Sequence, residues 1–277
     1  MSNRPATLGE LLSLSWEEYK KRGITILAVM LISTAVLGIL TIMLVLCGGV
    51  GAAIFAHTQV DKGWVIALIA AVVLLAFIMT ILGLWFYTAI LAIIVDEELG
   101  IIEAFRCGWK NFWPMTWVIT IFSGMIITGL ILGVLPGILV LVWFSFSFYI
   151  LLEEERKGMD ALLASMEYVR GDWWNTFGKL LVIWLISLLI GIIPFIGSLL
   201  SILFYPFLTL FMVAVYHDLK SRKGTVELQV NPGVRIFWWV ITVIGLIIPI
   251  IAMIGAIASL FYGDGSIRLE QTESLFL

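Results

Sequence analysis

Residues 23–56 read GITILAVMLISTAVLGILTIMLVLCGGVGAAIFA, a run of 34 residues with no charged side chain and no histidine. A helix needs about 20 apolar residues to cross the hydrocarbon core of a bilayer, so this run can span it with length to spare. Residues 63–95 and 236–263 form runs of the same kind. Each of these three runs predicts one membrane-spanning helix.

Two further charge-free runs, 111–152 and 180–216, are each long enough for two helices. Leu135-Pro136-Gly137 lies inside the first run, and Pro194 lies inside the second between two glycines. Proline and glycine in this arrangement mark a helix end and a tight reversal. The sequence therefore predicts seven helices, over residues 24–46, 65–95, 114–135, 137–152, 177–193, 195–216 and 236–262. The alternative for 114–152 and 177–216 is a re-entrant hairpin that does not cross fully.

The overall composition agrees with a membrane protein. Hydrophobic residues make up 62% of the 277 residues, charged residues only 13%, and the mean hydropathy is +1.12. Soluble domains carry roughly a quarter charged residues, so a water-soluble fold is excluded. The net charge of −3 offers no basic surplus for a nucleic-acid partner, and Cys47 and Cys107 form no disulfide framework. We expect an all-α, polytopic transmembrane helical bundle that forms a single integral membrane domain over residues 1–277.

The orientation follows from the positions of the basic residues. Of the 16 lysines and arginines, 14 fall on one side under the seven-helix assignment, and only Lys62 and Arg268 fall on the other. Basic loops stay in the cytoplasm. We therefore expect a multi-pass protein of the cytoplasmic (inner) cell membrane, with its N-terminus in the cytoplasm and its C-terminus outside.

Three segments that precede predicted spans resemble one another. Residues 10–16, 103–109 and 160–166 each begin with an acidic residue and carry apolar residues at helical spacing. Ser15, Gly108 and Ser165 occupy the same position in the three segments. This pattern predicts amphipathic helices at the cytoplasmic interface and a parallel internal repeat. The predicted repeat units are residues 7–95, 100–152 and 158–217, followed by a terminal helix over 235–262. The alternative is that any segment between hairpins tends to be amphipathic.

These residues also carry a family resemblance. The series Glu103-Ala-Phe, Trp109, Leu135-Pro-Gly-Ile138, Gly158-Met-Asp-Ala-Leu162, Ser165, Gly171, Pro194 and Tyr216-His-Asp-Leu219 is similar to a group of bacterial multi-pass membrane proteins of unknown function. It resembles the membrane domain attached to some glycerophosphodiester phosphodiesterases. The resemblance covers about residues 100–220 and implies an integral protein of the cytoplasmic membrane. The chain has no room for the hydrolase domain, so the resemblance does not extend to phosphodiesterase activity.

The sequence contains no recognisable enzyme motif. There is no HExxH, G-x-S-x-G, Walker A or CxxC sequence, and the charge-free runs hold no ionisable group for ion coupling. His57 and His217 fall on opposite sides of the membrane and cannot share a metal. We interpret His217-Asp218 as a solvated helix terminus. We therefore predict no catalytic residue, no metal site and no cofactor.

Two acidic clusters end predicted spans, Asp96-Glu97-Glu98 and Glu153-Glu154-Glu155. Oxygen ligands that converge from two elements would suit a cation site. The interpretation that we favour is a solvated boundary that stops each span, partly neutralised in the second cluster by Arg156 and Lys157.

Tryptophan and small residues have structural interpretations. Eight tryptophans lie near the predicted cytoplasmic interface and suggest an aromatic belt rather than a ligand cage: Trp16, Trp109, Trp113, Trp117, Trp173, Trp174, Trp238 and Trp239. Small residues recur around the end of the predicted helix 114–135 and in the predicted helix 236–262: Gly129, Gly133, Gly137, Ala252, Gly255 and Ala256. They predict close helix packing, with a contact in a homo-oligomer as the alternative.

Two classes of function remain. The first is a non-enzymatic scaffold, assembly partner or lipid-associated factor, with membrane lipids, a second copy or other membrane proteins as partners. The second is a permease-like or channel-like protein for a small uncharged or lipid-like solute. In that case the hydroxyl groups of the spans would line its path: Ser33, Thr34, Thr80, Thr120, Thr128, Ser187, Ser198 and Thr209.

Overall fold

The structure is a computed structural model that describes residues 4–57, 62–193, 196–228 and 231–273. Every regular element in these residues is an α-helix, and they contain no strand. Seven of their segments are long and apolar enough to cross a membrane: Leu8–Gly51, Ile66–Val95, Phe112–Ile131, Val134–Glu153, Trp173–Gly191, Leu200–Lys223 and Pro232–Gly255. The chain is an integral multi-pass membrane protein. The predicted fold class and the predicted number of spans are confirmed.

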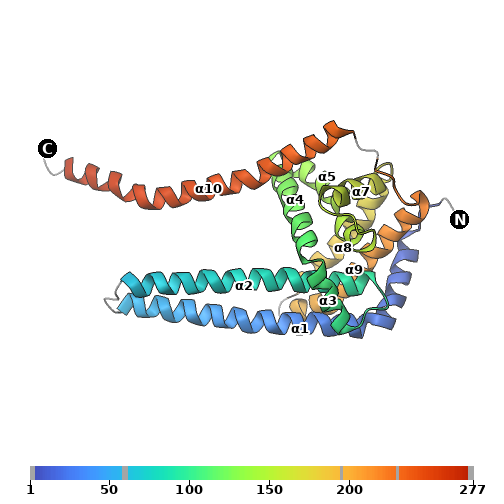
Figure 1. Ribbon diagram of the computed structural model, residues 1–277, viewed down its shortest axis with the longest axis horizontal. Coiled ribbons are helices and arrows are strands. Elements are labelled where there is room, and N and C mark those ends of the chain that lie inside the picture. Colours follow the sequence, from blue (N-terminus) through green and yellow to red (C-terminus); the bar gives the residue numbers. More distant parts are fainter. Residues whose placement is uncertain (1–3, 58–61, 194–195, 229–230, 274–277) are drawn as a thin grey trace.

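The helices follow one another with short connections. In chain order they are α1 (Leu8–His57), α2 (Lys62–Val95), α3 (Ile101–Lys110), α4 (Phe112–Ile131), α5 (Val134–Phe144), α6 (Ser147–Glu153), α7 (Met159–Val169), α8 (Trp173–Gly191), α9 (Ile196–Lys223) and α10 (Pro232–Glu273). Helices α1 and α2 lie side by side as a long hairpin, and α10 packs against α4 (Figure 1). The far ends of this hairpin and of α10 extend from the remaining helices toward the same side (Figure 1).

The first reversal lies earlier than the sequence suggested. Helix α4 ends at Ile131 and α5 begins at Val134, so the turn falls at Leu132 and Gly133 rather than at Pro136-Gly137. Gly133 has a φ of 132°, which residues with a side chain rarely adopt. Pro136 occupies the first turn of α5, where its missing N–H costs no helical hydrogen bond. The glycine therefore makes the turn, and the proline begins the next helix.

The fourth span is formed by two helices with a break between them. Helix α5 ends at Phe144 and α6 begins at Ser147. The buried Ser165 hydroxyl bridges this break, because it accepts the Phe146 N–H (3.1 Å) and donates to the Trp143 carbonyl (2.7 Å). One side chain of α7 thus satisfies two backbone groups that the break leaves without helical partners.

The three predicted interfacial segments differ in structure. Residues 8–20 belong to the continuous helix α1 and do not form a separate helix, although Figure 1 shows the first turns of α1 at an angle to the rest. No proline interrupts α1, so nothing in its sequence ends the helix before the span. Helix α3 is amphipathic, with Ala104 and Gly108 buried, and Gly108 lies directly against Ala89 of α2. Helix α7 does not lie on a surface, because its residues 161–165 are all completely buried.

Small residues bring helices close together at two places. A Cβ atom on Gly245 of α10 would lie 1.8 Å from the Gly124 carbonyl oxygen of α4. At the same crossing, the Thr128 hydroxyl donates to the Ile241 carbonyl (2.7 Å). Gly129 packs in the same way against Gly137 across the α4–α5 turn. Packing within the bundle, as predicted, accounts for Gly129 and Gly137.

The crossing of α4 and α10 provides a test of this packing. We expect Gly245→Ala to destabilise the protein by about 1–3 kcal/mol, because the added methyl group must displace the backbone of α4. Gly255→Ala is the matched control on the same helix, since a Cβ atom there would meet nothing within 4 Å. The measurement is the free energy of unfolding of the purified protein in detergent. Equal stability of both variants would contradict the close crossing.

Candidate functional site

Four segments meet at one end of the bundle, which we call the polar end: residues 4–22, 95–111, 153–179 and the described part of 216–235, which is 216–228 and 231–235. The Ala6 N–H donates to Asp218, and an Arg22 nitrogen lies 3.8 Å from a Glu97 oxygen. Lys220 donates to Glu153 (2.8 Å). These contacts join the segments that hold 14 of the 16 lysines and arginines. The side of the membrane that this end faces stays a prediction.

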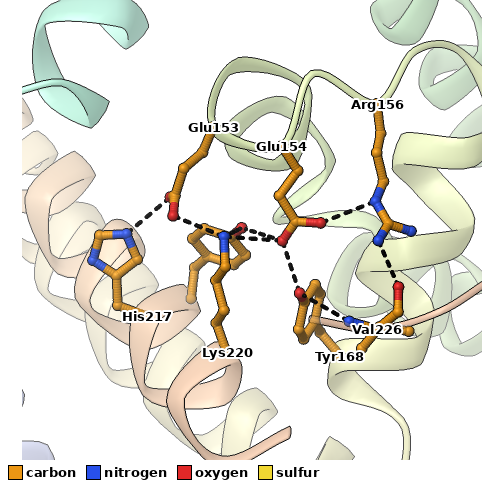
Figure 2. Close-up of polar contacts among 8 residues, drawn as sticks. Glu153, Glu154, Arg156, Tyr168, His217, Lys220 and Val226 are labelled. Atoms are coloured by element: carbon orange, nitrogen blue, oxygen red, sulfur yellow. Dashed lines mark hydrogen bonds and ion pairs between the residues drawn. The ribbon is translucent and has the colours of Figure 1, made fainter. Parts of the chain in front are cut away.

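Glu154 is the centre of a buried polar cluster (Figure 2). Its side chain, 7% exposed, accepts hydrogen bonds from the hydroxyls of Tyr168 (2.7 Å) and Tyr216 (2.8 Å). Two cations also contact this carboxylate, Arg156 at 2.9 Å and Lys220 at 3.1 Å. The cluster therefore ties the end of α6 to α7 and α9.

The environment of Glu154 favours its ionised form. Burial alone would raise the pKa of this carboxyl group. The hydrogen bonds from Tyr168 and Tyr216 and the charge of Lys220 outweigh burial and hold the pKa of Glu154 below its ordinary value. Burial, together with the hydrogen bond to the carboxylate, raises the pKa of Tyr168 to about 12. Glu154 therefore acts as an acceptor for two neutral phenols.

Glu154 corrects the interpretation of its cluster as a solvated boundary, whereas Glu153 and Glu155 are exposed, as that interpretation expects. Glu153 pairs with His217 (2.9 Å) and Lys220 (2.8 Å), and Glu154 is almost completely buried. Their neutralising partners come mainly from α9, which local sequence could not reveal. Asp96, Glu97 and Glu98 are exposed, in agreement with a solvated boundary. Among the described residues, no group of three or more His, Cys, Asp or Glu side chains could hold a metal ion.

Asp218 corrects the interpretation of His217-Asp218 as a solvated helix terminus. The Asp218 side chain is 8% exposed and pairs with Lys179 of α8 (3.1 Å), which is 6% exposed. Arg222 also contacts Asp218 (3.4 Å) and reaches Asp172 (3.0 Å). His217 is half-exposed, as expected for a terminus. Asp218 therefore joins α8, α9 and the N-terminal segment.

The candidate hydroxyls of the spans bond mainly to their own helices. Each of five donates to the carbonyl four residues before it: Ser33, Thr80, Thr120, Ser187 and Thr209. Thr128 bonds within α4 and to α10, Thr34 is exposed, and the side chain of Ser198 lies outside the described part of the chain. Three cavities lined by described residues have volumes of about 460, 390 and 320 Å³, and none of the three is lined by these hydroxyls.

The eight tryptophans do not share one environment, and two of them, Trp173 and Trp239, are half-buried. Five have exposed side chains, as an interfacial belt requires: Trp16, Trp109, Trp113, Trp117 and Trp174. Trp238 is buried, with its ring centroid 4.9 Å from that of Phe144, and Trp173 stacks on Phe177. The belt interpretation therefore does not hold for Trp238, which is a core residue.

Sequence reasoning missed most partners in the polar clusters. Tyr168 and Tyr216 come from different helices, and each is an ordinary apolar position by its local pattern. The spacing of Asp218 and Arg222, four residues apart on one helix, was a usable signal for one ion pair.

No family model, no curated protein and no solved structure matches this chain. The polar end must therefore be interpreted from its own chemistry.

The pKa of Glu154 generates a prediction about acid stability. A carboxyl group with a lowered pKa in the folded state stabilises the protein above its unfolded pKa of 4.5, and this contribution is lost as the pH falls through the folded value. We expect Glu154→Gln to lower stability at pH 7 by about 3 kcal/mol, as for a broken buried ion pair. We also expect its stability to fall less than that of the wild type below pH 4.5.

The measurement is the free energy of unfolding as a function of pH in detergent. Glu155→Gln is the matched control, because Glu155 is the exposed neighbour of Glu154. If the free energy of unfolding of Glu154→Gln fell as steeply at low pH as that of the wild type, groups other than Glu154 would cause the fall.

Proposed function

We propose that this protein is a non-enzymatic, lipid-associated scaffold or assembly partner of the cytoplasmic membrane, with its polar end in the cytoplasm. One observation carries the proposal: buried charged side chains of the polar end form ion pairs between helices. Lys179 with Asp218 and Lys220 with Glu154 are examples. Side chains that neutralise one another hold helices together and are not free to bind or transform a polar substrate.

The apolar surface supports partners within the membrane. In the most apolar 18-residue stretch of Ile66–Val95, no residue is buried. In the corresponding stretch of Pro232–Gly255, only 17% of the residues are buried. Such surfaces contact lipid chains or other membrane helices. Without a hydrophobic force between helices in lipid, protein partners would be selected by packing.

The alternative, a permease-like or channel-like protein, needs polar groups along a path through the bilayer. The hydroxyls bonded to their own helix carbonyls do not favour such a path, because their donors are already used. The scaffold therefore remains our proposal.

We also propose a distant relation to the membrane domain of glycerophosphodiester phosphodiesterases, and a parallel internal repeat. The order of elements supports the repeat, because α3 precedes the spans α4 and α5–α6 as α7 precedes α8 and α9. Ser15, Gly108 and Ser165 are all buried, which supports equivalent positions. Superposition of residues 100–152 on residues 158–217 in an experimental structure would test the repeat.

Lipid retention tests the proposed lipid association, and glycerol permeability separates it from the permease. We expect the purified chain to keep bound phospholipid through detergent exchange, seen by native mass spectrometry, because apolar side chains cover its spans. Vesicles containing the protein should be no more permeable to glycerol than vesicles without protein. Complete loss of lipid, or protein-dependent glycerol flux, would contradict the proposal, and flux would favour the permease.

A further inference from the structure

A cavity of about 390 Å³ lies at the polar end between α1, the end of α2 and α9. Its volume falls within the range of small-molecule sites, roughly 300–1,000 Å³. One part of its wall is apolar and includes Ile94, Leu210 and Val213. Another part is polar and includes Glu18, Glu97 and Ser221. The cavity is therefore amphipathic.

The cavity lies where lipid headgroups are expected. On α9, its lining residues 210–214 belong to the apolar run that ends at Tyr216, and its lining residues 217–221 follow that run. On α2, they include Ile94 and Val95, the end of the apolar run, and Glu97 beyond it. The cavity therefore straddles the boundary between hydrocarbon and water on two helices.

Two charged groups of the wall, Arg22 and Asp218, already have opposite charges beside them. Arg22 contacts Glu18 and donates to the carbonyl oxygens of Ile93 and Ile94. The Asp218 charge is balanced by Lys179 and Arg222. The positive charges that would attract an anionic headgroup are therefore already paired with carboxylates of the protein.

Two carboxylates of the wall retain capacity to accept hydrogen bonds. Glu97 is 65% exposed, and its contact with Arg22, at 3.8 Å, is too long for a hydrogen bond. Glu18 Oε1 accepts a hydrogen bond from Lys21 (2.9 Å). The buried Glu18 Oε2 lies 3.4 Å from Arg22 Nε, and neither atom has a hydrogen-bond partner among the described residues. A ligand group that complements the Glu97 carboxylate carries a positive charge and several hydrogen-bond donors, as a primary ammonium does.

We propose that this cavity binds the headgroup of an amine-bearing phospholipid, phosphatidylethanolamine, whose ammonium donates to Glu97 and Glu18. The ammonium lies beyond the phosphate in this headgroup, so it can enter the cavity while the phosphate stays in the headgroup layer. The two methylene groups between phosphate and ammonium pack against the wall that includes Leu210 and Val213. This proposal rests on the proposed lipid association and names the lipid.

The test compares short-chain lipids on the full-length protein in detergent. Didecanoyl phosphatidylethanolamine, phosphatidylcholine and phosphatidylglycerol are titrated separately, and binding is followed by native mass spectrometry and by the thermal unfolding midpoint. We expect phosphatidylethanolamine to bind most tightly. We expect Glu97→Gln to weaken the affinity for phosphatidylethanolamine about tenfold, the effect of losing one hydrogen bond between charged groups.

Glu98→Gln is the matched control, because Glu98 is exposed and does not line the cavity. Its affinity should equal that of the wild type. Glu18→Gln is a second variant with the same expected direction as Glu97→Gln. Equal or tighter binding of phosphatidylglycerol, or unchanged affinity in both cavity variants, would overturn the proposal.

Soluble O-phosphoethanolamine distinguishes a lipid from a free amine. Binding of this compound as tight as that of the lipid would overturn the lipid assignment. If no lipid binds at all, the proposed lipid association fails as well. If all three lipids bind equally, only the selection of an ammonium group fails.

Discussion

A bilayer does not tolerate unpaired charge, and the arrangement of this protein follows from that constraint. Its spans are long charge-free runs, and its charged side chains gather at their ends. Where packing buries such a charge, it forms an ion pair with an opposite charge from another helix, as Asp218 does with Lys179. Removal of one partner from such a pair is costly, because the other charge stays buried. The buried pairs therefore hold α6, α8 and α9 in register at the polar end.

This arrangement limits what the protein can do. The polar clusters bind their own helices, and small residues such as Gly124 and Gly245 join α4 to α10. Among the features left for other molecules are the apolar faces of the spans and the amphipathic cavity beside Glu97. Both suit lipid, and the faces also suit helices of a partner. The scaffold role that we propose is consistent with these features.

The spans could be predicted from the sequence because hydropathy and the absence of charge act locally along the chain. The polar clusters could not, since the burial of Glu154 depends on Tyr168 and Tyr216, which come from distant segments. The same reason explains α7, whose pattern is amphipathic although other helices bury most of it and leave polar residues such as Asp160 and Glu167 partly exposed. The turn at Gly133 was misplaced because a nearby proline gave a stronger signal than the glycine that makes the turn.

The sidedness of the polar end tests this account most directly. Single cysteines are introduced at positions 62, 110, 157 and 266 in a protein lacking Cys47 and Cys107, and cells are treated with a membrane-impermeant maleimide. The account predicts labelling at 62 and 266 in intact cells, and labelling at 110 and 157 only after the membrane is opened. Labelling at 157 in intact cells would contradict the orientation. Labelling at 62 but not at 266 would mean that the last apolar segment does not cross.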